Sequence, residues 1–142
     1  MAADISRPLI VVGMDGSPGS RAALQWAVAH AELIGATVHA VLAWQLPETH
    51  SYTSRDTEAD ARITLNTAID AALGPDQRAR VTALVTPGRP GHVLMEASSG
   101  AQLLVVGSHR HGDLVERLIG SVSQYCVTHA SCPVVVVPKA LT

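Results

Sequence analysis

Five strand-length apolar runs, separated by longer segments, constrain the fold of this chain more than any other feature. The first, residues 9–15 (LIVVGMD), is apolar without alternation, which is typical of a strand buried on both faces. The segments between the runs are long enough for a helix or a loop. The other predicted strands cover residues 37–44, 80–88, 102–107 and 132–138.

Helices are predicted in most of the intervening segments. The segment that begins at Ser17 has a suitable capping residue, a proline at the first helical position (Pro18) and a closing glycine (Gly35). Residues 45–58 are polar and irregular and predict a mobile loop. The remaining predicted helices cover residues 59–74, 90–100 and 113–131. The apolar face expected for the first helix consists of Ala23, Trp26, Ala27, Leu33 and Ile34.

This alternation of strand and helix predicts an α/β fold. Right-handed crossovers would give one open parallel sheet with helices on both faces. Ligands of such sheets bind outside the carboxyl ends of the strands, where the strand order reverses. The ends of the first strand (Gly13, Met14, Asp15) and of the fourth (Gly107, Ser108) are the best candidates for a site. With no internal repeat and no linker, residues 1–142 are expected to form a single domain.

Composition excludes several classes of protein. The chain has 142 residues, 47% hydrophobic and 15% charged, which is typical of a globular protein with a sizeable core. A net charge of -2 and the absence of a basic run argue against a nucleic-acid partner. No apolar stretch approaches the ~18 residues of a membrane span, and residues 1–10 do not read as a signal peptide, so we expect a cytoplasmic protein with no membrane partner. Cys126 and Cys132 are then expected to be reduced, partly buried thiols.

Residues 105–123 (VVGSHRHGDLVERLIGSVS) have the features of a phosphate-binding loop. A bare Gly107 lets a ligand approach the backbone, and Gly120-Ser121 can offer backbone N–H groups to a phosphate. Arg110 can add a charged contact, and Asp15 is an acceptor for a ribose hydroxyl or an adenine amino group. The spacing matches neither a P-loop nor a dinucleotide fingerprint. An alternative stays open: the glycines are turn and packing residues, and Asp15 is an acceptor for the backbone at the start of the next helix.

The same residues do not favour a metal site or catalysis. His109 and His111 flank Arg110, but no third metal ligand accompanies them, so we expect exposed histidines near phosphate. Ser17 and Ser20 have no evident base partner. No cluster of carboxylates or general base is placed to activate water, and we expect a binding protein, with slow hydrolysis of its ligand at most.

The chain resembles the universal stress protein family. The resemblance is carried by IVVGMDGSPGSRAALQWA (10–27) and LLVVGSHRHGDLVERLIGSVSQYCVTHASCPVVVVP (103–138), with ATVHAVLAW (36–44) between them. It implies an adenine nucleotide alpha hydrolase-like, Rossmann-like sheet of five strands in the order 3-2-1-4-5. It also implies a homodimer that functions in the stress response. Some members of the family bind ATP and others do not.

The ATP-binding members share a motif of Gly, two residues, Gly, nine residues, then Gly and Ser or Thr. Here the motif begins at Gly107 and closes at Gly120-Ser121, but Arg110 stands at its second glycine. Gly112 matches a further glycine of the family loop. The ligand implied is ATP, with or without Mg²⁺, and the predicted binding residues are Gly13, Met14, Asp15, Ala43, Val106, Gly107, His109, Arg110, Gly112, Gly120, Ser121, Val122 and Ser123.

Two functions therefore compete. The first is an ATP-binding, dimeric stress regulator without strong catalytic activity. The second is a dimeric interaction module in which Arg110 has closed the phosphate site and no nucleotide binds. In both cases the strand PVVVVP (133–138) is an apolar edge that must be covered or paired, and the resemblance supports self-pairing through Pro133–Val137.

Overall fold

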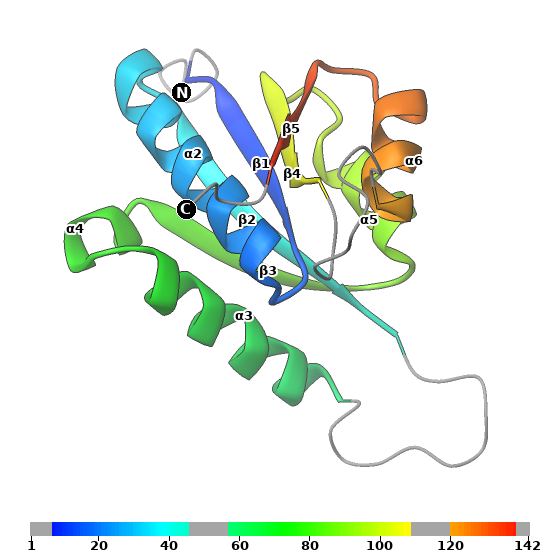
Figure 1. Ribbon diagram of the computed structural model, residues 1–142, viewed down its shortest axis with the longest axis horizontal. Coiled ribbons are helices and arrows are strands. Elements are labelled where there is room, and N and C mark those ends of the chain that lie inside the picture. The colour runs from blue at the N-terminus through cyan, green and yellow to red at the C-terminus, as the bar shows by residue number, and fades with distance from the viewer. Residues whose placement is uncertain (1–6, 46–56, 109–119, 139–142) are drawn as a thin grey trace.

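The five strands form one parallel sheet in a computed structural model, which describes residues 7–45, 57–108 and 120–138 (Figure 1). The strands are β1 (Leu9–Met14), β2 (Thr37–Trp44), β3 (Val81–Pro87), β4 (Leu103–Gly107) and β5 (Val134–Val137). Their order is β3-β2-β1-β4-β5, and every neighbouring pair is parallel. The predicted fold class and strand order are confirmed.

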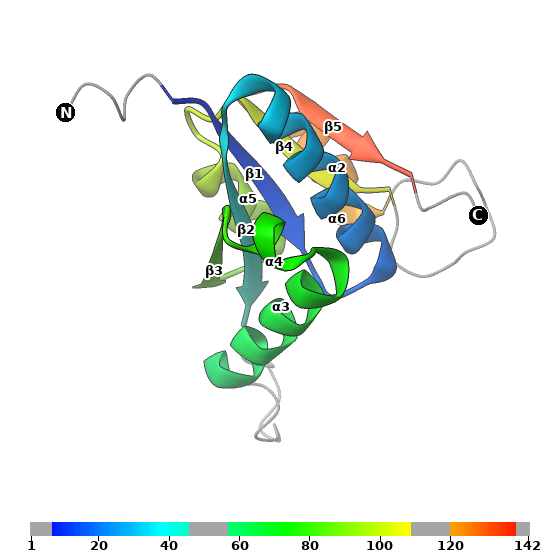
Figure 2. The same ribbon diagram turned by 90° about the vertical axis from the view of Figure 1, so that its left-hand side faces the viewer.

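Helices cover both faces of the sheet. α2 (Pro18–Ile34) and α3 (Glu58–Ala72) lie on one face, and α5 (Pro90–Ala97) and α6 (Ser121–His129) lie on the other (Figure 2). Successive residues of β1 serve the two layers: Ile10 and Val12 are buried with α2 and α3, and Val11 is buried with α5 and α6. A central parallel strand is therefore apolar at every position, as its sequence pattern predicted.

The ends of α2 match their sequence signals. Ser17 caps the helix, since its hydroxyl oxygen accepts a hydrogen bond from the Ser20 N–H at 3.2 Å. Pro18 occupies the first turn, where its missing N–H costs nothing. Gly35 ends the helix in a left-handed conformation with φ 71°.

The predicted apolar face of α2 is wrong in part. Trp26 and Ile34 are each 38% exposed and Leu33 is 82% exposed. The helix buries mainly small residues together with Leu24 and Val28, and Trp26, Leu33 and Ile34 lie off that buried face. Its buried residues are Gly19, Ser20, Ala23, Leu24, Ala27, Val28 and Ala31.

The prediction of one helix over 113–131 is also wrong at Gly120. This residue has φ -61° and ψ 160°, which is extended backbone, and it is the N-cap of α6. Its N–H donates to the Ser108 carbonyl at 2.6 Å, which fastens the start of the helix to the end of β4. Residues 113–119 and most of the predicted loop 45–58 lie outside the described residues.

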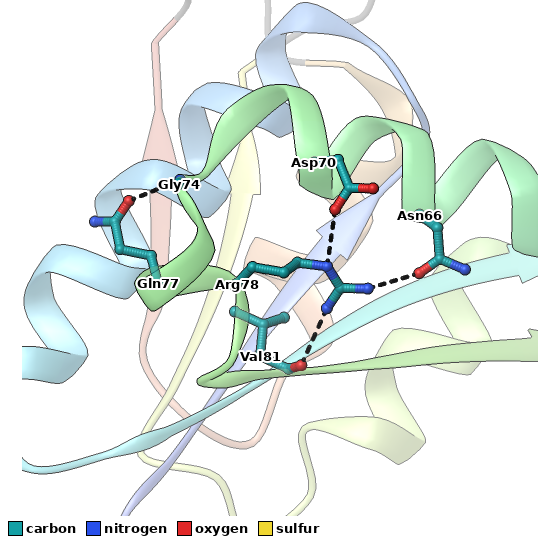
Figure 3. A network of polar contacts seen from close by, with 6 residues as sticks. All are labelled: Asn66, Asp70, Gly74, Gln77, Arg78 and Val81. Carbon is teal, nitrogen blue, oxygen red and sulfur yellow. Dashed lines mark hydrogen bonds and ion pairs between the residues drawn. The ribbon is translucent and has the colours of Figure 1, made fainter.

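A short helix that was not predicted, α4 (Pro75–Arg78), follows α3. The Arg78 guanidinium donates to Asp70 at 3.0 Å, to Asn66 at 2.8 Å and to the Val81 carbonyl at 3.4 Å (Figure 3). One side chain thus ties α4 to α3 and to the start of β3. The network lies at the start of β3, whereas the predicted site is at the carboxyl ends of the strands.

Cys126 and Cys132 are both free thiols in the structure. Cys126 is completely buried on α6, and burial raises its pKa to about 11, with a further contribution from the nearby Cys132. It is a core residue that stays protonated at neutral pH. Among the helices of the described residues, none is both long and apolar enough to cross a membrane.

Candidate functional site

A cavity of about 190 Å³ lies at the carboxyl ends of β1, β2 and β4. This is the point where the strand order reverses, because β2 and β4 flank β1 on opposite sides. All the predicted binding residues that the structure describes line it: Gly13, Met14, Asp15, Ala43, Val106, Gly107, Gly120, Ser121, Val122 and Ser123. The other three, His109, Arg110 and Gly112, lie outside the described residues.

One wall of the cavity is apolar. Val41, Leu42 and Ala43 come from the end of β2, and Val106 from the end of β4. Leu94 of α5 completes the wall, and Gly13 is the reason that it can pack there: a Cβ on Gly13 would lie 2.7 Å from the Leu94 Cδ1 atom. A flat apolar ligand group would find van der Waals contacts along this wall.

Asp15 follows β1 directly, and its side chain is exposed at the rim of the cavity. Its Oδ1 atom accepts a hydrogen bond from the Ser17 N–H at 2.9 Å. Asp15 therefore does accept a hydrogen bond from the backbone at the start of α2, as the alternative interpretation expected. This bond occupies one of its two carboxylate oxygens. Within the described part of the chain, no donor reaches Oδ2, so the carboxylate retains an acceptor for a ligand hydroxyl or amino group.

The start of α6 brings backbone donors to the cavity. The first N–H groups of a helix have no acceptor within the helix. Here the N-cap is Gly120, which makes no side-chain capping bond. The hydroxyl of Ser123 does not cap either, because it donates to the Gly107 carbonyl. Ser121 and Val122 thus present N–H groups that no described side chain caps, at the positive end of the helix dipole.

Gly107 has a structural role that its sequence position did not predict. A Cβ at this position would lie 2.8 Å from both the carbonyl carbon and the carbonyl oxygen of Gly19 in α2. The glycine is required for the close packing of α2 on β4, whatever the cavity binds. That Gly107 also lets a ligand approach the backbone stays a prediction.

Several cavity residues were not predicted as binding residues. Pro90 and Leu94 come from the first turns of α5, and Val41 and Leu42 precede Ala43 on β2. Only the sequence GRP at 88–90, with Gly88 at φ 133°, marks the turn that brings α5 to the cavity. In the described ranges, no three His, Cys, Asp or Glu side chains are grouped closely enough to hold a metal ion.

Comparison with known families assigns this chain. The model of the universal stress protein family matches residues 8–138. The chain belongs to this family. Among its relatives, universal stress protein Rv2005c of Mycobacterium tuberculosis is 35% identical over 130 residues, which cover 89% of this chain and 44% of the relative. The chain thus spans a little less than half the length of this curated universal stress protein.

Solved structures of universal stress proteins share the fold. One, in complex with cAMP, has a TM-score of 0.70 at 22% identity and covers 94% of this chain and 98% of its own. Another, from Archaeoglobus fulgidus in complex with dAMP, has a TM-score of 0.68 at 23% identity and covers 93% and 98% respectively. At these identities the likeness establishes the sheet topology and the helical layers.

Proposed function

We propose that the cavity binds an adenine nucleotide and that its ligand is ATP, with or without Mg²⁺. The observation that carries this proposal is that three kinds of group converge on one cavity. An apolar wall suits the base, the Asp15 carboxylate suits the ribose hydroxyls, and the uncapped first turn of α6 suits phosphate. The two similar structures in complex with cAMP and dAMP support the same class of ligand.

Titration calorimetry with adenosine, AMP, ATP and ATP with Mg²⁺ tests the proposal. Saturable binding that tightens as phosphates are added is the expected result, because each phosphate adds charge near the α6 N–H groups. Adenosine is the control for the apolar wall and Asp15 alone. No heat with any of these compounds at millimolar concentration would contradict nucleotide binding.

The second candidate, an interaction module without nucleotide, is favoured by one observation. Arg110 stands where the motif of ATP-binding members has its second glycine. The variant Arg110→Gly separates the two functions. A gain in ATP affinity means that the arginine closes the phosphate site, and a loss means that it contacts phosphate.

We further propose that the protein acts in the cytoplasm as a nucleotide-responsive regulator and not as an efficient catalyst. The cavity supplies groups that hold a ligand, namely N–H donors, hydroxyls and one carboxylate. Release of inorganic phosphate from ATP, measured over hours at saturating nucleotide, is expected to stay far below one turnover per second. Multiple turnovers per second would make the protein an ATPase.

We also propose a homodimer through Pro133–Val137. β5 is an edge strand of apolar residues, and it pairs with β4 alone within the described residues. The carbonyls of Pro133 and Val137 accept bonds from β4, at 3.0 Å from Leu104 N and 2.9 Å from Ser108 N. Backbone N–H and C=O groups point to alternate sides along a strand, so those of residues 134 and 136 point away from β4 toward the open edge. They can pair with a second copy of the chain.

The mass of the protein in solution tests the dimer. Light scattering is expected to give the mass of two chains at micromolar concentration. Val136→Pro removes an outward N–H without removing a bond to β4, and proline is tolerated on an exposed strand edge. We expect this variant to be a folded monomer. A monomeric wild-type protein would contradict the proposal.

A further inference from the structure

A second hollow, of about 260 Å³, lies beside the main cavity and between α5 and α6. Two residues, Ser121 and Val122, line both spaces. The second hollow therefore adjoins the main cavity at the first turn of α6. The described residues that line it are Arg89, Gly91, His92, Ser121, Val122 and Tyr125.

The lining of this hollow has the chemistry of an anion site. Arg89 and His92 are both exposed, and the lining residues that the structure describes include no Asp or Glu. Arg89 is the N-cap residue of α5, but its side chain makes no capping bond. It also takes part in neither of the ion pairs formed among the described residues. A guanidinium that pairs with no carboxylate of the described residues is matched in shape and charge to phosphate oxygens.

The floor of the hollow is rigidly packed. A Cβ on Gly91 would lie 2.7 Å from the Tyr125 Cδ1 atom, so the tyrosine ring rests directly on the backbone of α5. The ring also meets His92 edge-on, with centroids 5.8 Å apart, and His129 at 4.2 Å. These contacts fix the first turns of α5 and α6 relative to each other and hold Arg89 and Ser121 on either side of one space.

We propose that the second hollow holds the outer phosphate groups of a nucleotide whose base and ribose lie in the main cavity. The ligand class is then adenine nucleotides with a polyphosphate chain, and Arg89 is the residue that distinguishes them from AMP. This inference rests on the proposed binding of a nucleotide in the main cavity. A free polyphosphate carries the same phosphate groups. The experiment below distinguishes it from the phosphate chain of a bound nucleotide.

Titration calorimetry of Arg89→Ala with ATP, AMP and adenosine is the test. Arg80→Ala is the matched control, because Arg80 is also an exposed arginine and precedes β3, at the opposite end of the strands. We expect Arg89→Ala to weaken ATP binding about tenfold and to leave AMP and adenosine unchanged, with part of the loss restored in Arg89→Lys. An ATP affinity that falls no further than in Arg80→Ala overturns the inference.

Two more outcomes are decisive. If the wild-type protein binds AMP and ATP but Arg89→Ala binds ATP as tightly as the wild type does, this inference fails and the proposed function stands. If it binds no nucleotide at all, both fail.

Tripolyphosphate added to the AMP complex is expected to give heat that depends on Arg89, and to give none with the ATP complex. Heat that depends on Arg89 in both complexes would assign the hollow to a separate polyanion and overturn the assignment to the nucleotide.

Discussion

Two helices begin at the candidate site, and their first turns are built differently. At the start of α2, Ser17 accepts a bond from Ser20 N and Asp15 accepts one from Ser17 N, and Pro18 has no N–H at all. At the start of α6, Gly120 has no side chain with which to cap. The N–H groups of Ser17 and Ser20 at the start of α2 are thus bonded by the chain's own side chains, while the first N–H groups of α6 have no side-chain cap among the described residues.

The difference assigns opposite roles to the two helix starts. An anion needs donors, so it gains little at α2 and much at α6. Ser17 and Ser20 also line the cavity, but their hydroxyls are bonded within the start of α2, so the main contribution of this side is an acceptor, the carboxylate of Asp15. The comparison predicts that changes at α2 alter stability or the binding of the nucleoside, and that changes at α6 alter the binding of phosphate.

The largest effect is expected where both helices meet the same strand end. In Gly107→Ala the new methyl group would lie 2.8 Å from the backbone of Gly19, so α2 or β4 has to move. We expect a loss of about 2 kcal/mol in the free energy of unfolding, measured by urea denaturation. Gly74→Ala is the control, because a Cβ there meets nothing within 4 Å. Equal stability of the two variants would refute the close packing.

Removal of the Ser17 cap of α2 is expected to lower the free energy of unfolding and to leave ATP affinity unchanged. Ser17→Ala should lose about 1 kcal/mol of unfolding free energy, with ATP affinity unchanged. Thr57→Ala removes the equivalent cap of α3, where Thr57 Oγ1 accepts from Asp60 N at 3.2 Å, and should lose a similar amount. A fall in ATP affinity confined to Ser17→Ala would show that α2 also contacts the ligand's phosphates.

The smallest effect on stability is expected for Asp15→Asn. The amide oxygen can still accept from Ser17 N, so the free energy of unfolding should change by less than about 0.5 kcal/mol. Adenosine affinity should fall about fivefold, because a ligand hydroxyl loses a charged acceptor. If calorimetry finds adenosine binding unchanged, Asp15 acts only at the helix start.

The segments and strand ends that matter for the site could be predicted from the sequence, because apolar runs and their terminating glycines are local signals. The strand order came from family resemblance. The buried face of α2 includes residues 20, 23, 24, 27, 28 and 31, which follow the i, i+3, i+4 spacing of a helix, so the prediction failed because it chose Trp26 and Leu33 by hydrophobicity and not by spacing. The packing of Gly107 on Gly19 and the entry of Leu94 into the cavity appear only in three dimensions, because they join residues far apart in the sequence.

The central claim, that the N–H groups of α6 bind phosphate, is tested most directly by calorimetry of two variants at one position. Ser121→Ala removes a hydroxyl, while Ser121→Pro also removes the N–H and gives α6 the first-turn proline that α2 already has. Proline suits this position, and the extended Gly120, with ψ 160°, is compatible with it. We predict that Ser121→Pro binds ATP about tenfold more weakly than Ser121→Ala, with equal affinity for adenosine. Equal ATP affinities in the two folded variants would contradict the claim.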